Sequence, residues 1–240
     1  MKKLLIISLA AIGLLSACST YQMNTVSSTN TFLDEKAGGF KFENDSLKIT
    51  YAFAGQDMPI HVTIYNKLNE PVYVDWKRSA LISDNQSYSY ADDAVQINGD
   101  ISGVSVGRGI AYSSSSVNAQ ATLPQNVVFI PPHTQITKNV SKLDKNKLKY
   151  IAGDSFVKTK VPGYGLGDEN VKIAKFDKDN SPYLFKSYLT VYTLDGNTPK
   201  FKAYTHDFYI SQITRSSVAP ESFEAFRGGR GDYFITSTGN

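Results

Sequence analysis

Residues 47 to 76 read LKITYAFAGQDMPIHVTIYNKLNEPVYVDW, and this stretch decides the fold. Apolar side chains occupy every second position in three runs, at residues 47–53, 60–65 and 72–76. Such alternation places one face of a β-strand against a core and the other face against solvent. Turn-forming residues separate the runs at 55–57 and 66–71. The pattern therefore predicts a three-stranded meander.

Two further regions of the chain have strand patterns. Residues 184–194 and 201–213 are long runs joined by Asp-Gly-Asn-Thr-Pro at 195–199, which predicts a hairpin. Residues 127–130 and 134–137 flank two consecutive prolines, Pro131 and Pro132. Because proline cannot donate a ladder hydrogen bond, we expect these two segments at a sheet edge or at a switch between sheets.

Helical patterns are scarce, and only residues 141–151 and 220–226 are compatible with short helices. We therefore expect a mainly β protein, an antiparallel β-sandwich with long loops and one or two short helices. Trp76, on the third run, resembles the buried tryptophan of immunoglobulin-like sandwiches, although the cysteine pair of that motif is absent. The resemblance covers roughly residues 45–140 and the late hairpin. Trp76 is expected to be buried on the same face as Val72 and Val74.

The N-terminal segment has the pattern of an export signal. Lys2 and Lys3 precede an apolar run that ends in Leu15-Ser16-Ala17-Cys18, and this run is too short for a permanent membrane span. The segment resembles a bacterial lipoprotein signal, with these last four residues as the lipobox. The resemblance implies that residues 1–17 are removed and that Cys18, the only cysteine, carries the lipid. A retained transmembrane anchor and an ordinary secretory signal cut near Ala17 are the alternatives.

The same resemblance implies a location in the cell envelope. Ser19 rather than an acidic residue follows the cysteine, which in lipoproteins is typical of sorting to the outer membrane, facing the periplasm. Residues 19–24 contain no charged cluster of the kind that directs some lipoproteins to the cell surface. Surface exposure is left as an open alternative.

The mature chain has room for a large core, because removal of 17 of the 240 residues leaves 223. Residues 18–37 are rich in Ser, Thr and Asn, which predicts a flexible tether. Residues 38–240 are then the sandwich domain. Loop insertions are expected near 84–126, which include four consecutive serines, and near 142–180, which are rich in lysine.

The charge balance and the single cysteine limit what the protein binds and how it is stabilised. Without Lys2 and Lys3, 23 basic residues stand against 22 acidic ones, so broad electrostatic attraction for nucleic acid or for acidic lipid is excluded. A single cysteine allows no internal disulfide, so stability must come from packing.

One motif suggests catalysis. Gly103-Val104-Ser105-Val106-Gly107 matches the G-x-S-x-G pattern of a nucleophile elbow, and His206 follows it in the chain order that a triad permits. The elbow, however, needs a buried parallel strand before the serine and a helix after it. Neither pattern is present around Ser105, which favours a non-catalytic protein.

No metal or cofactor site is predicted. The three histidines, His61, His133 and His206, lack a partner at metal-ligand spacing. The segment 177–181 begins like a calcium loop, but it lacks the glycine and the glutamate that an EF-hand requires, so only a looser site stays open. Arg230-Gly231-Asp232 spells a cell-adhesion tripeptide, a match that short sequences produce often by chance.

These observations together predict a lipid-anchored, non-catalytic binding or assembly module of the cell envelope. Its loops or an edge strand would be presented to an envelope protein or to a glycan. The first alternative is a serine hydrolase that uses Ser105 and His206. The second is a carbohydrate-binding lipoprotein, since the chain has 15 tyrosines and a solvent-facing cluster of them would suit a sugar.

Overall fold

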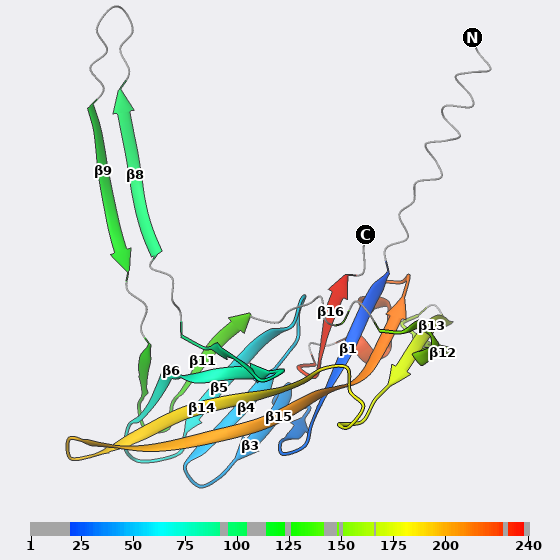
Figure 1. Ribbon diagram of the computed structural model, residues 1–240, viewed down its shortest axis with the longest axis horizontal. Coiled ribbons are helices and arrows are strands. Elements are labelled where there is room, and N and C mark those ends of the chain that lie inside the picture. Colours follow the sequence, from blue (N-terminus) through cyan, green and yellow to red (C-terminus); the bar gives the residue numbers. More distant parts are fainter. Residues whose placement is uncertain are drawn as a thin grey trace, which may run out of the picture.

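The computed structural model contains two antiparallel β-sheets packed face to face, with a separate hairpin that stands away from them (Figure 1). The expected mainly β, antiparallel sandwich is therefore confirmed. Its Ig-like assignment stays a prediction. The structure describes residues 20–91, 96–104, 114–122, 126–141, 148, 151–165, 167–227 and 230–237.

The larger sheet, here called sheet A, has nine strands among the described residues. Six of them lie in one continuous order, β10 (Val127–Ile130), β6 (Val72–Ser83), β14 (Leu184–Asp195), β15 (Thr198–Ser216), β1 (Tyr21–Ser28) and β16 (Tyr233–Ser237). The other three pair at its margins, β7 (Gln86–Ser89) with β6, β13 (Gly167–Lys175) with β15, and β12 (Val157–Gly163) with β13. The pair β14 and β15 confirms the hairpin predicted from the sequence.

The smaller sheet, sheet B, has five strands among the described residues. Their order is β11 (Gln135–Ser141), β5 (Pro59–Asn66), β4 (Leu47–Ala52), β3 (Gly39–Glu43) and β2 (Phe32–Asp34). A two-stranded hairpin of β8 (Gln96–Val104) and β9 (Ser114–Thr122) forms a third sheet of its own.

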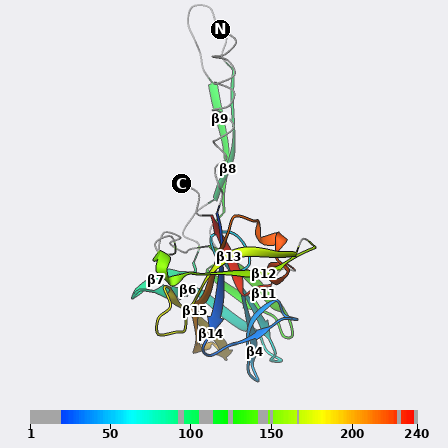
Figure 2. The ribbon, with the colours of Figure 1, turned by 90° about the vertical axis from the view of Figure 1, so that its right-hand side faces the viewer.

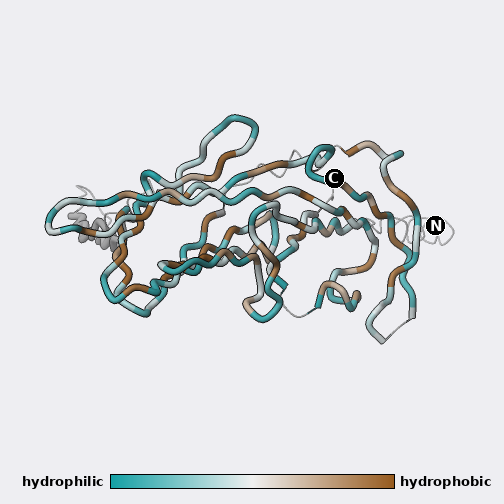
Figure 3. Tube along the Cα trace, turned by 90° about the horizontal axis from the view of Figure 1, so that it is seen from below, coloured by the Kyte–Doolittle hydropathy of each residue, from teal (hydrophilic) through white to brown (hydrophobic). Residues whose placement is uncertain are grey.

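The core lies between sheets A and B. In Figure 2 strands β14 and β15 lie to the left and β4 and β11 to the right, while hairpin β12–β13 crosses in front of both. Alternation along the strands turns the apolar side chains inward, and the hydropathy colours of Figure 3 alternate accordingly. Phe53, Phe185 and Phe208 meet at the centre with ring centroids 5.2–5.5 Å apart. Trp76 is only 2% exposed, as predicted.

The predicted three-stranded meander is wrong at its third strand. Strand β5 pairs with β4 in sheet B, whereas β6 belongs to sheet A, so the chain changes sheet between Asn66 and Val72. The buried side chain of Asn66 holds this crossing, since its Nδ2 donates to the carbonyls of Glu70 (2.7 Å) and Ile130 (3.0 Å). A second crossing lies beside it, where Pro131 and the following residues join edge strand β10 to edge strand β11. The predicted role of the prolines is confirmed.

The predicted tether is wrong for most of its length. Residues 21–28 form strand β1, which lies between β15 and β16 and buries Met23 and Val26. On the face opposite Met23, β1 also buries two amides. Gln22 Nε2 donates to Asn24 Oδ1 (2.9 Å), and Asn24 Nδ2 donates to Thr236 Oγ1 (3.1 Å). A strand that buries polar groups in this way is stable because each group finds a partner.

The expected loop at 84–126 is also only partly correct. Residues 86–89 form β7, and the following Tyr90 is buried against Trp76 with ring centroids 6.5 Å apart. Tyr90 therefore belongs to the core, although it lies within the segment that was expected to be a loop insertion. Farther along, β8 and β9 pair with each other, and among the described residues neither pairs with a strand of sheet A or sheet B.

The expected insertion at 142–180 contributes to sheet A. Strand β13 pairs with β15 and buries Val171 and Ala174. Of the two predicted short helices, residues 220–226 form two 3₁₀ turns, η3 (Pro220–Ser222) and η4 (Glu224–Phe226). A third turn, η2 (Gly153–Ser155), precedes β12. Most of the other predicted helix, 141–151, lies outside the described residues.

Candidate functional site

Four aromatic side chains form a row across four neighbouring strands of sheet A. Phe129 of β10 is in register with Tyr73 of β6, Tyr73 with Tyr192 of β14, and Tyr192 with Phe201 of β15. Their ring centroids are 6.4, 4.9 and 5.0 Å apart in that order. With strands spaced about 4.8 Å apart, this aromatic row crosses about 15 Å of the sheet.

The row faces solvent because the alternation of each strand turns it away from the core. Tyr73 lies between the buried Val72 and Val74, and Phe129 precedes the buried Ile130. Phe129 is 57% exposed and Phe201 is 48% exposed. The outer face of a sandwich sheet is usually polar, so a contiguous row of rings indicates a surface that meets another molecule.

The two central rings of the row stand on edge rather than lying flat on the sheet. Tyr73 and Tyr192 are stacked with 8° between their planes, at a centroid distance that matches the strand spacing. Their faces therefore point along the sheet toward each other, and their edges point outward. The flat faces that stacking on a sugar ring would require are covered for this pair.

An edge strand continues the same surface. Strand β10 ends the strand order of sheet A, and it exposes Val127 (46%) as well as Phe129. An edge strand leaves a line of backbone donors and acceptors to which another extended segment can pair. The apolar side chains of β10 would lie beside such a segment.

A bulge in β6 adds a cation to the row. The register between β6 and β14 shifts beside Tyr188 and Thr190, and there Ser79 Oγ accepts from the backbone N–H of Thr190 (2.9 Å). The bulge carries Arg78, whose guanidinium lies 4.6 Å from the ring centroid of Phe201. Bulges commonly redirect a side chain in this way, and arginine on an aromatic ring is frequent in binding surfaces.

An acidic group lies on the same face. Asp75, two residues after Tyr73, forms an ion pair with Arg78 at 3.6 Å. Partial burial raises the pKa of Tyr192, and the charge of Asp75 raises it further. The hydroxyl of Tyr192 therefore stays protonated at neutral pH and is able to donate a hydrogen bond to a partner.

The outer face of sheet B has a different character. There Thr63 and Thr137 have their hydroxyl oxygens 2.8 Å apart, and His61 Nδ1 lies 2.7 Å from Asn139 Oδ1. These are the polar cross-strand pairs expected of a solvent-facing sheet. The aromatic row is thus particular to sheet A.

The end of the β14–β15 hairpin also lines a cleft. Its volume is about 430 Å³, and Tyr192 and Phe201 border it together with Leu47, Leu68 and Val191. The apolar surface of the row therefore continues around the hairpin into a concave site, a shape typical of ligand and peptide sites.

His206 does not form an accessible site. Its side chain is 2% exposed between the two sheets, Nδ1 lies 2.8 Å from the hydroxyl of Tyr51, and the ring of Phe42 is 4.7 Å away. Burial lowers the pKa of His206 to about 4. A histidine enclosed in this way has no path to a substrate, whereas the neighbouring Asp207 faces outward and pairs with Lys186 at 3.2 Å.

The other sequence-predicted residues are placed as follows. Ser105 and Cys18 lie outside the described residues, but strand β8, which ends one residue before Ser105, pairs in antiparallel fashion with β9 rather than within a parallel sheet. His133 is exposed with Nε2 2.9 Å from Asn69 Oδ1. Within the described part of the chain, no helix is long and apolar enough to cross a membrane.

Two short motifs have structural roles. Asp232 of the Arg-Gly-Asp tripeptide is 2% exposed, and Arg230 Nε donates to its Oδ1 at 3.0 Å, so the tripeptide is not displayed as an adhesion loop. In the segment that resembles a calcium loop, Asp177 Oδ1 accepts from the backbone N–H groups of Asp179 (2.9 Å) and Asn180 (3.1 Å). This carboxylate therefore stabilises its own turn.

Comparison with known proteins finds no matching family model, curated protein or solved structure. The candidate site therefore depends on its geometry alone. The sequence predicted that a cluster of exposed tyrosines was a possible surface, but it did not identify the members of the row. The available signal was an aromatic residue next to a buried aliphatic one, which holds for Tyr73, Phe129 and Tyr192, whereas Phe201 lies between two exposed lysines.

Proposed function

We propose that this protein is a non-catalytic binding module of the bacterial cell envelope, anchored by lipid at Cys18, that captures another envelope protein through the aromatic row and edge strand β10. The observation that carries the proposal is the solvent-facing row of four rings in direct cross-strand register. Tyrosine, phenylalanine and arginine are enriched at protein interfaces and supply much of their binding energy.

Two features favour a protein partner over a glycan. The stacked rings present edges and hydroxyls outward, which suits packing against side chains better than stacking on sugar faces. Strand β10 exposes both a backbone edge and two apolar side chains, which suits the addition of an extended segment of a partner. A glycan ligand is the second candidate, favoured by the length of the row across four strands.

The position of the row supports a role in reaching away from the membrane. Strand β1 begins at Tyr21, three residues after Cys18, so a lipid there holds the domain close to the bilayer. Figure 1 places the turn of hairpin β14–β15 at the far end of the long axis from hairpin β12–β13 and the first residues of β1. The row flanks that turn. We also propose sorting to the outer membrane, facing the periplasm, because the lipobox and Ser19 resemble the pattern of lipoproteins sorted there.

The anchor is tested by Cys18→Ser. Because only the thiol accepts the diacylglyceryl group, this variant is expected to lose acylation and to accumulate with its first 17 residues attached. Mass spectrometry of the N-terminal peptide and membrane fractionation measure the effect, with Ser19→Ala as the matched control. A Cys18→Ser protein that is processed like the wild type contradicts the anchor.

The binding face is tested by photo-cross-linking in the intact envelope. A photoreactive phenylalanine analogue in place of Val127 is expected to give a discrete protein adduct, and the same analogue at Thr63, on the outer face of sheet B, to give none. Tyr73→Ala with Tyr192→Ala is expected to reduce the adduct at least about tenfold, because interface aromatics contribute about 2 kcal/mol or more each. Tyr65→Ala, an aromatic change on sheet B, is the matched control.

The outcomes separate the two partner classes. An adduct of equal yield at Val127 and Thr63, or one that the double variant leaves unchanged, contradicts the proposed face. The purified protein is also applied to envelope polysaccharide from which protein has been removed by protease. If the wild type is retained and the Tyr73 and Tyr192 double variant is not, the row binds a glycan instead.

A further inference from the structure

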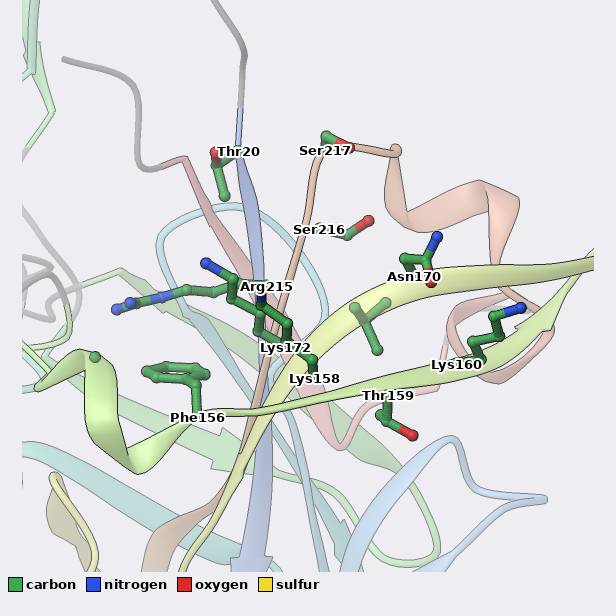
Figure 4. Close-up of a pocket in the computed structure, with 12 residues that line it drawn as sticks. Thr20, Phe156, Lys158, Thr159, Lys160, Asn170, Lys172, Arg215, Ser216 and Ser217 are labelled. Carbon is green, nitrogen blue, oxygen red and sulfur yellow. The ribbon is translucent and has the colours of Figure 1, made fainter.

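A cavity of about 600 Å³ lies at the end of sheet A where hairpin β12–β13 meets β15 and the residue before β1 (Figure 4). Four basic side chains line it, Lys158, Lys160, Lys172 and Arg215, and its lining residues include no Asp or Glu among those that the structure describes. Threonine, asparagine and serine side chains supply neutral hydrogen-bonding groups, and Gly153, Phe156 and Val171 complete the wall. The lining is therefore suited to an anion.

Three of these cations form one cross-strand row. Lys158 of β12 is in register with Lys172 of β13, and Lys172 is in register with Arg215 of β15. Like charges directly opposite each other destabilise a sheet. Of the residues that the structure describes, no carboxylate lies within ion-pair distance of any of these three. Lys158 and Lys172 are exposed, so solvent screens part of this repulsion, and an anion bound between the three cations would relieve more of it.

Arg215 is held in place within this row. Its Nε donates to Gln22 Oε1 at 2.8 Å, and its guanidinium lies 4.2 Å from the ring centroid of Phe156. Nη2 is buried and has no hydrogen-bond partner among the described residues. Burial also lowers the pKa of Arg215, as expected of a cation that no described carboxylate compensates. A guanidinium held in place beside two lysines suits phosphate recognition.

The place of the cavity indicates the source of the anion. Thr20 lines the cavity, and Cys18 precedes it by two residues, a distance of at most about 7 Å along an extended chain. A lipid on Cys18 would place the headgroup region of the bilayer at the mouth of the cavity. Phosphate esters are the anions concentrated there.

We propose that this cavity binds the phosphate of an anionic phospholipid headgroup in the membrane that carries the anchor. The inference rests on the proposed lipidation of Cys18 for its choice of ligand. Headgroup binding adds a second, electrostatic contact to the lipid and fixes the orientation of the domain, with hairpin β12–β13 toward the bilayer and the aromatic row away from it.

The test uses purified full-length protein in neutral detergent, titrated by calorimetry with water-soluble dihexanoyl phosphatidylglycerol. Dihexanoyl phosphatidylcholine and inorganic phosphate are titrated in parallel. Phosphatidylglycerol is expected to bind at least tenfold more tightly than either, and more weakly as ionic strength rises. Lys158→Gln with Lys172→Gln is expected to weaken phosphatidylglycerol binding by about twenty-five-fold, from about fivefold for each lysine near an anionic lipid surface.

The control is Lys175→Gln with Lys178→Gln, which removes two exposed lysines on and just after β13 that do not line the cavity. It is expected to bind and to melt like the wild type, whereas the Lys158 and Lys172 variant is expected to be at least as stable as the wild type, because two opposed cations are removed. Equal affinity for phosphatidylcholine, or full binding by the Lys158 and Lys172 variant, overturns the inference. Inorganic phosphate bound as tightly as phosphatidylglycerol also overturns it. Since no bilayer is used, this result is independent of the Cys18→Ser outcome.

Discussion

Replacing Trp76 with alanine is expected to lower the free energy of unfolding by about 3–5 kcal/mol, the usual cost of emptying a large aromatic site in a core. Trp76 is 2% exposed, and it packs in the main core with Tyr90, whose ring centroid is 6.5 Å away. Its indole contacts both sheets, because Lys138 of β11 lies over the ring at 5.5 Å. The neighbours are held by strands and are unable to collapse fully into the space.

Urea denaturation followed by circular dichroism measures this loss, since the variant has no tryptophan left. Tyr73→Ala, three residues earlier but on the outer face of the same strand, is the matched control and is expected to cost far less. Wild-type fluorescence should resist quenching by iodide. A cost below about 1 kcal/mol for Trp76→Ala, with an unchanged m-value, would show that the site is not a packed part of the core.

The strands of the core were predictable from the sequence, but their partners were not. Alternation in residues 60–65 and 72–76 shows which side chains face inward, and it is the same whether the two strands pair in one sheet or face each other across two. Asn66 favours the arrangement in two sheets, because its buried amide holds the loop that crosses from one sheet to the other. The prolines at 131 and 132 were informative because proline restricts the backbone directly.

Strand β1 was missed because it buries polar residues. Gln22 and Asn24 count against a core strand on any hydropathy scale, and they are buried only because their amides bond to each other and to Thr236 and Arg215. These partners are more than 190 residues away in sequence. No local pattern contains that information.

The aromatic row could not be predicted for a related reason. Each ring sits at an outward position that alternation alone identifies, as Tyr73 does between two valines. That the four outward positions coincide depends on the register of three strand pairs, including the shift at the β6 bulge. The basic cavity depends on register in the same way, because Lys158, Lys172 and Arg215 are far apart in the chain.

Acidification from pH 6.5 to pH 4 is expected to destabilise the protein through His206. Burial between the sheets lowers its pKa to about 4, whereas the imidazole of an unfolded chain titrates near 6.5. Between these values the unfolded chain binds a proton that the folded chain does not, so stability is fully present above pH 6.5 and falls as the pH decreases. The full effect is about 3 kcal/mol, since each pKa unit corresponds to about 1.4 kcal/mol.

The measurement is urea denaturation at closely spaced pH values from 7 to 4, repeated with His206→Gln. Glutamine keeps a polar, uncharged partner for Tyr51 and does not titrate, so the variant should lose much of the slope between pH 6.5 and 4 even if it is less stable throughout. His61→Gln, which changes an exposed imidazole on sheet B, should keep the wild-type slope. Equal slopes in the wild type and His206→Gln would contradict a neutral imidazole in the folded protein between pH 4 and pH 6.5.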